Sequence, residues 1–204
     1  MTSPKGVFCL ESPWGTNGDL RNRSTVLHQL RMLEGAEYCG KVIHHDVVTR
    51  EEFDFYLKEW LKQKYTIGYP LGYLAFHGAK GALMISKTEL SLNDLATVIG
   101  PGKAHDRILY FGSCSTMAAP EAELKAFCKK TGAKAIVGYT RPIDWLESAS
   151  FDCLVVPRLL MMRFTKSVFT SLKKEHPTFV RRLGLRIATA TLATPRKIAV
   201  EAAA

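Results

Sequence analysis

Short apolar runs alternate along the chain with longer segments whose apolar residues recur at helical spacing. A run that is apolar at nearly every position, and is bounded by turn-forming residues, is typical of a strand buried inside a parallel sheet. The runs that fit this description are residues 6–11, 40–46, 73–76, 108–111 and 135–139. They predict the main strands of a sheet.

The segments between these runs carry helix signals. Thr49 and Glu52 have the spacing of a capping box, in which both side chains bond backbone N–H groups at a helix start. Pro120 suits a first helical turn. We expect helices over residues 25–34, 50–61, 92–99, 120–130, 144–164, 165–175 and 177–193.

This alternation of strands and helices predicts the α/β class, with a mostly parallel sheet sandwiched by helices. Residues 82–92 are expected to form a small hairpin beside the strand 73–76. A length of 204 residues fits a single domain. We expect an α/β core over residues 5–160 and a basic helical extension over residues 161–204.

Positive charge is concentrated near the C-terminus. The chain carries 28 basic and 19 acidic side chains, of which residues 158–204 contribute 10 basic and 2 acidic. Such a block suits an acidic protein, an anionic membrane or nucleic acid, and equally an ordinary solvated helix face. Few aromatic residues interleave with these charges, which argues against nucleic acid as a partner.

The five cysteines include no C-x-x-C pair, which argues against a disulfide framework or a zinc site. No apolar window approaches the roughly 18 residues that a membrane span needs, and the N-terminus lacks the layout of a signal peptide. We therefore expect a cytoplasmic protein with reduced thiols, no metal and no other cofactor.

Two of the apolar runs end in a reactive side chain. One is followed by His77-Gly78 and another by a glycine and then Ser113-Cys114. Because the carboxyl ends of parallel strands meet at one edge of a sheet, where α/β proteins bind ligands, His77 and Cys114 are expected to lie at the same edge. A histidine beside a cysteine is the arrangement of a base and a thiol nucleophile. The helix predicted after Cys114 would favour its thiolate.

Together and in this order, these motifs resemble the caspase-like cysteine peptidases, which include caspases, metacaspases, clostripain, gingipains, separase and the bacterial CHAT proteins. In that family the strand that ends in His-Gly precedes the strand that ends in the nucleophilic cysteine, and a small hairpin follows the histidine. Here 37 residues separate His77 from Cys114. The resemblance implies a caspase-haemoglobinase-like fold over about residues 5–160.

The resemblance also implies an activity. As a caspase-like peptidase, the chain would use His77 as the base and Cys114 as the nucleophile, with the backbone amides of Gly78 and Cys114 as the oxyanion hole. Its substrates would be proteins or peptides, and no metal would be required. Relatives of this size imply a bacterial defence or cell-death effector that a protein partner activates.

Substrate recognition is less well marked. Clostripain relatives that cleave after basic residues carry an aspartate two residues before the nucleophile, where this chain has Gly112. The candidate substrate-binding residues are Ser113, Arg141 and Asp144. Asp144 has two interpretations, as a helix N-cap or as a group at the catalytic edge, and Arg141 at that edge would select an acidic side chain.

Three other interpretations remain open. The first is a catalytically inactive caspase-like scaffold that binds a protein or nucleotide at the same edge. The second is a different thiol hydrolase, although Thr116 stands where the nucleophile-elbow pattern Gly-x-Cys-x-Gly has its second glycine. The third is a nucleic-acid binder, which a steep salt dependence of binding would reveal.

Overall fold

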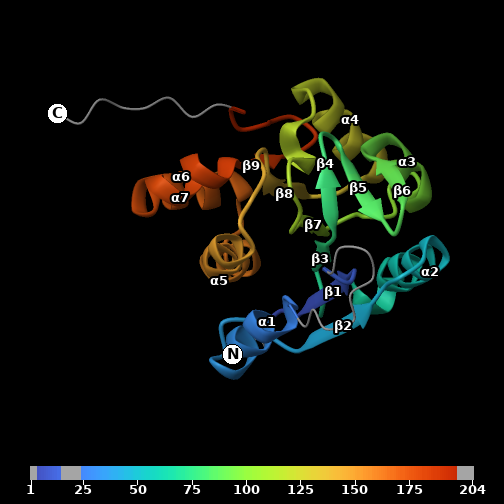
Figure 1. Ribbon diagram of the computed structural model, residues 1–204, viewed down its shortest axis with the longest axis horizontal. Helices are drawn as coiled ribbons and strands as arrows, with labels where there is room; N and C mark the ends of the chain where they lie inside the picture. Colours follow the sequence, from blue (N-terminus) through green and yellow to red (C-terminus); the bar gives the residue numbers. More distant parts are fainter. Residues whose placement is uncertain (1–3, 15–23, 197–204) are drawn as a thin grey trace.

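A computed structural model describes residues 4–14 and 24–196 (Figure 1). Its centre is a six-stranded sheet with the order β2-β1-β3-β7-β8-β9, in which the last strand is antiparallel and the others are parallel. The strands are β1 Val7–Glu11, β2 Val42–Asp46, β3 Leu71–Ala75, β7 Ile108–Phe111, β8 Ala135–Tyr139 and β9 Leu185–Ala188. The predicted α/β class with a mostly parallel sheet is therefore confirmed.

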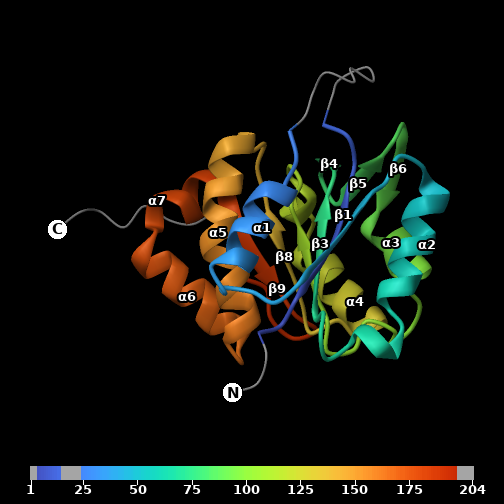
Figure 2. The same ribbon diagram turned by 90° about the horizontal axis from the view of Figure 1, so that it is seen from below.

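Helices cover both faces of this sheet (Figure 2). One face packs against α1 (Leu27–Gly35), α5 (Trp145–Met161) and α6 (Thr165–Glu175), and the short α7 (Pro177–Phe179) follows on the same side. The other face packs against α2 (Arg50–Trp60), α3 (Leu92–Ile99) and α4 (Glu121–Thr131). This double cover explains why the strands are apolar at nearly every position, since each side chain meets a helix layer.

The capping box is confirmed, whereas Pro120 is the N-cap of α4 and lies just before its first turn. Thr49 accepts a hydrogen bond from the Glu52 amide, and the Glu52 carboxylate accepts one from the Thr49 amide, so the capping box at the start of α2 is confirmed. The predicted hairpin is also present as β5 (Ala82–Ile85) and β6 (Thr88–Ser91). It is wider than expected, because β4 (His77–Ala79) pairs with β5 and makes a three-stranded sheet.

The C-terminal segment differs from its prediction. Residues 177–193 were expected to be helical, but the helix ends in a π turn (Val180–Gly184) and β9 then pairs with β8. The apolar spacing of Leu183, Leu185 and Ile187 suits a strand as well as a helix, and Gly184 decides between them. Its φ of +69° ends the helix, and a Cβ there would lie 2.2 Å from Thr140 Oγ1. The extension is thus only partly helical, and its strand completes the central sheet.

None of the helices within residues 4–14 and 24–196 combines the length and the apolar character that a membrane crossing requires.

Candidate functional site

The sheet topology brings His77 and Cys114 to one edge. Strands β3 and β7 are parallel neighbours, and Leu74 pairs in register with Phe111. His77 lies three residues beyond Leu74, and Cys114 lies three residues beyond Phe111. Both side chains line one cavity of about 270 Å³.

Four segments enclose this cavity, which we call the edge cavity. They are the chain on either side of residues 15–23, the end of β3, the end of β7 and the start of α5 with the residues before it. Residues 12–22 are rich in Gly, Asn, Asp and Ser, which predicts a loop, and most of this segment lies outside the described residues. The lining residues are Trp14, Ser24, Val26, Gln29, Tyr73, Phe76, His77, Gly112, Ser113, Cys114, Ile143, Trp145, Ser148, Ala149 and Asp152.

Cys114 is half-buried, and the backbone N–H of Ile143 donates to its sulfur at 3.4 Å. The next residue, Ser115, has a φ of +57°, a conformation that few residues other than glycine adopt. Its amide donates to the Arg141 carbonyl at 3.0 Å, which holds the turn in place. The helix predicted over residues 120–130 is present as α4, and a short 3-10 turn (Thr116–Ala118) lies between Cys114 and its start. An amide from the loop before α5, rather than a helix end, therefore faces the thiol.

Of the other four free cysteines, Cys9, Cys39 and Cys128 are buried, as small apolar residues usually are, and Cys153 is half-buried. Burial raises the pKa of Cys39 to about 11 and that of Cys128 to about 12. Burial likewise raises the pKa of Cys9 and of Cys153. All four thiols stay protonated near neutral pH, and a protonated thiol is a weak nucleophile.

His77 opens β4 rather than closing β3, and its imidazole is exposed. The indole of Trp14 meets the imidazole edge to face, with ring centroids 5.4 Å apart and an interplanar angle of 74°. The ring therefore has solvent on one side and an aromatic wall on the other.

Gly78 joins the histidine loop to the cysteine loop. A Cβ at this position would lie 2.3 Å from the Cys114 carbonyl oxygen and 2.7 Å from Thr116 Oγ1, so only glycine allows this approach. Ser113 is buried beside it and shares a hydrogen bond of 2.7 Å with Thr116 Oγ1, which in turn donates to the Ala82 carbonyl. The predicted oxyanion residues Gly78 and Cys114 are therefore packed against each other.

Arg141 and Asp144 are not brought into the edge cavity. Both are exposed, and the Asp144 carboxylate accepts a hydrogen bond from the Glu147 amide at 2.9 Å. Of its two interpretations, the helix N-cap is the one that its contacts support. The exposed side chain of Arg141 gives no support to selection of an acidic group in this cavity.

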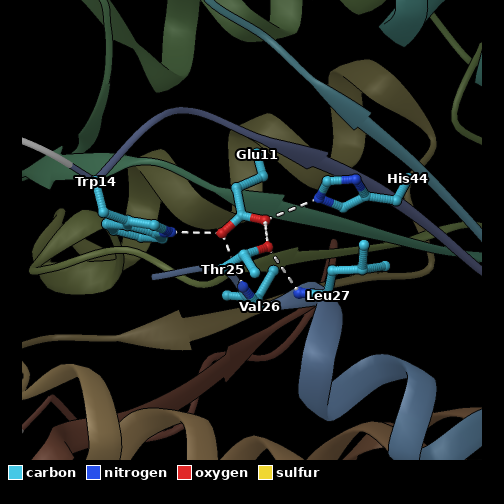
Figure 3. Close-up of polar contacts among 6 residues, drawn as sticks. All are labelled: Glu11, Trp14, Thr25, Val26, Leu27 and His44. Carbon is cyan, nitrogen blue, oxygen red and sulfur yellow. Dashed lines mark hydrogen bonds and ion pairs between the residues drawn. The ribbon is translucent and has the colours of Figure 1, made fainter. Parts of the chain in front are cut away.

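A buried carboxylate, Glu11, holds one wall of the cavity together (Figure 3). It accepts hydrogen bonds from Trp14 Nε1, Thr25 Oγ1, the Val26 amide and His44 Nε2. Burial alone would raise the pKa of Glu11, but the hydrogen bonds outweigh it and lower the pKa. Glu11 thus links Trp14 on one side of residues 15–23, and Thr25 and Val26 on the other side, to strands β1 and β2. The same contact positions Trp14 against His77.

Glu11, His44 and Asp46 also have potential metal-ligand atoms within 4.8 Å of one another. A carboxylate offers about four acceptor positions, and protein donors already approach Glu11 from four groups. A metal ion would have to displace His44 or Thr25 from these contacts. We therefore interpret Glu11 and His44 as parts of a hydrogen-bonded network.

Replacing Glu11 by glutamine is expected to destabilise the fold, because an amide keeps one acceptor oxygen and presents a donor to the other groups. Each buried donor left unpaired costs about 1–3 kcal/mol, measured as unfolding free energy in urea. The loss should be greatest above the ordinary carboxyl pKa and should shrink as acid protonates Glu11 in the wild type. Glu59→Gln is the control, since Glu59 pairs only with lysines near the surface, and its loss should stay within about 1 kcal/mol. Equal losses in both variants would contradict the role of Glu11.

Sequence reasoning missed Asp152, which lines the edge cavity from α5. Its side chain is buried and accepts hydrogen bonds from the hydroxyls of Tyr73, Tyr110 and Tyr139. Burial raises the pKa of Asp152 to about 6, although the tyrosine hydrogen bonds oppose the shift. A signal was present in the sequence, since an aspartate beside Phe151 interrupts the apolar stripe of the predicted helix.

Comparison with known proteins gives a family. A family model described as a family of unknown function (DUF6642) matches residues 4–187. The chain belongs to this family. The region that matches the DUF6642 model contains Glu11, His77, Cys114 and Asp152, and it ends within β9. No curated protein matches the sequence.

Proposed function

We propose that this DUF6642 protein is a cysteine endopeptidase of the caspase-like type, with Cys114 as nucleophile and His77 as base. The observation that carries the proposal is the placement of these two residues at equivalent positions beyond a register pair of adjacent parallel strands, lining one cavity. The three-stranded sheet that starts at His77 and the helix layers on both faces of the main sheet agree with the resemblance to caspase-like peptidases.

The chemistry follows from the residues present. His77 takes the thiol proton of Cys114, and the thiolate attacks the carbonyl carbon of a peptide bond. The backbone amides of Gly78 and Cys114 stabilise the oxyanion of the tetrahedral intermediate. The imidazolium then protonates the leaving amine, and water hydrolyses the thioester to release the second product. The Ile143 amide, which faces the sulfur, stabilises the thiolate before attack.

The exposed position of His77 is compatible with this role. Within the described part of the chain, no hydrogen bond joins its imidazole to the Cys114 thiol. Catalytic hydrogen bonds are often long without substrate and tighten only in the complex. Binding of a partner protein at this edge of the sheet would likewise bring His77 and Cys114 into hydrogen-bonding distance. The resemblance to caspase-like peptidases therefore extends the proposal to a defence or cell-death effector that a partner activates.

The test compares the wild type with Cys114→Ala and with the matched control Cys153→Ala, since Cys153 is the other half-buried thiol. A diverse peptide library is incubated with each protein and the products are read by mass spectrometry. An acyloxymethyl ketone probe reports the reactive thiol in parallel. We expect cleavage and labelling by the wild type and by Cys153→Ala, and neither by Cys114→Ala.

Two outcomes would contradict the proposal. Cleavage that survives Cys114→Ala would assign the activity to other residues. A wild type that neither cleaves any peptide nor reacts with the probe would favour the non-catalytic scaffold, because a binding module has no need of a reactive thiol.

A further inference from the structure

Apart from the catalytic pair, the ionisable side chains that line the edge cavity are all potential anions. Besides the catalytic pair, its lining holds two other ionisable side chains, Asp152 and Tyr73. No lysine or arginine lines it among residues 4–14 and 24–196. A ligand that enters past Cys114 therefore meets a carboxylate with no protein cation beside it.

Asp152 still has room for one more donor. Its Oδ1 accepts from Tyr110 and Tyr139, and its Oδ2 accepts from Tyr73. A carboxylate offers about four acceptor positions, so one position on Oδ2 is not used by these tyrosines. No ion pair involves Asp152 within the described ranges, and a buried charge without a partner is costly. A cation supplied by a ligand would remove that cost.

The walls suit an aliphatic stem that ends in a cation. Ile143 and Ala149, which flank Cys114 and Asp152 in the lining of the cavity, supply apolar surface. Gly112 lets the Tyr73 ring, whose hydroxyl donates to Asp152, pack directly on the backbone beside Cys114, because a Cβ there would lie 2.6 Å from that ring. The long side chains of lysine and arginine bury their methylene groups along such surface and keep a polar partner for the charged end.

Gln29 also lines the edge cavity, and its carboxamide is a further group that could bind a cation. Its amide nitrogen is buried and has no hydrogen-bond partner in the part of the chain that the structure describes. Turning the carboxamide over brings its oxygen to that position. The oxygen would then accept a hydrogen bond from a bound cation.

We propose that the edge cavity binds the side chain before the scissile bond, and that it selects lysine or arginine through Asp152. This inference rests on the proposed peptidase activity and names its substrate class. The carboxylate reaches the cavity from α5, far along the chain from the nucleophile. Asp152 is here a specificity-determining residue and not part of the chemical step.

The test uses fluorogenic peptides that differ only in the residue before the scissile bond, which is lysine, arginine, norleucine or aspartate. Norleucine has a similar aliphatic stem to lysine but no charge. A hydrogen bond to a charged group is worth about 10- to 100-fold in affinity. We therefore expect the wild type to show kcat/KM for lysine and arginine at least about 10-fold above norleucine, and Asp152→Asn to lose this ratio.

Asp144→Asn is the matched control, since Asp144 is an exposed carboxylate outside the cavity, and it should keep the lysine preference. A second measurement needs no variant: Cys114 of the wild type should be labelled faster by a lysyl than by a norleucyl acyloxymethyl ketone. This keeps the inference testable if Asp152→Asn does not fold.

The outcomes separate the two proposals. A wild type that cleaves and prefers norleucine or aspartate overturns the lysine pocket and leaves the peptidase in place. Retention of the lysine preference in folded Asp152→Asn does the same. If no peptide is cleaved and no probe labels Cys114, the peptidase and its pocket fail together.

Discussion

Replacing His77 by alanine is expected to lower kcat/KM for peptide cleavage by about 10²- to 10⁴-fold, the range that a positioned acid–base residue contributes. Without the imidazole, the proposed reaction loses both the base that takes the Cys114 proton and the acid that protonates the leaving amine. The side chain of His77 is exposed, so its removal opens no core cavity and should leave the unfolding free energy nearly unchanged. The measurement is steady-state cleavage of the best library peptide, alongside urea denaturation of the same samples.

His28→Ala provides the control, because His28 is an exposed histidine on α1 that does not line the cavity. Its kcat/KM should match that of the wild type. A His77→Ala protein with full activity would show that another group removes the thiol proton. A folded protein that loses activity without losing labelling of Cys114 would place the role of His77 after formation of the thiolate, in protonation of the amine.

The placement of His77 and Cys114 at one edge of the sheet was predictable because it depends on local patterns. Two buried runs of similar composition each end in a turn, and parallel neighbours place their carboxyl ends together. The register then puts the two residues at equivalent distances beyond Leu74 and Phe111. Strand pairing did not need to be known in detail for this inference.

The polar networks around that pair were not predictable in the same way. Glu11 and His44 lie 33 positions apart, and Asp152 and Tyr73 lie 79 apart. Neither spacing forms a motif, since the partners meet only after strands and helices have packed. The clue that sequence does offer is a charged residue in an apolar context, such as Asp152 beside Phe151, and it does not say which group would satisfy the charge.

The error at the C-terminus has a different cause. The segment that forms β9 and the turn before it carries apolar residues whose spacing satisfies both a helix and a strand, so periodicity could not separate them. Arg186, which reads as a polar helix position, is instead buried. It donates to the carbonyls of Met117, Ala119 and Thr194. Arg186 belongs to the basic block that suits a solvated helix face, but its buried guanidinium instead holds β9 against the turn that follows Cys114.

The buried Asp152 makes stability depend on pH, and Asp152→Asn isolates that dependence. In the folded protein the pKa of Asp152 is about 6, against an ordinary value of 3.8. Between these values the folded state binds a proton that the unfolded state does not, so stability rises as pH falls through this window. Relative to Asp152→Asn, the wild type is expected to gain about 2.5 kcal/mol of unfolding free energy between pH 8 and pH 4.

Urea denaturation of both proteins at several pH values measures this difference, and titratable groups that the two proteins share cancel from it. The gain should appear mainly between pH 6 and 4, where Asp152 takes up its proton in the folded state. A difference that does not change with pH would mean that the tyrosine hydroxyls offset burial fully. A difference that falls on acidification would mean that they hold the carboxylate ionised more strongly than water does. In either case burial would cost the Asp152 carboxylate little net free energy. A bound lysine side chain would then stabilise it correspondingly less, which would weaken the proposed selectivity.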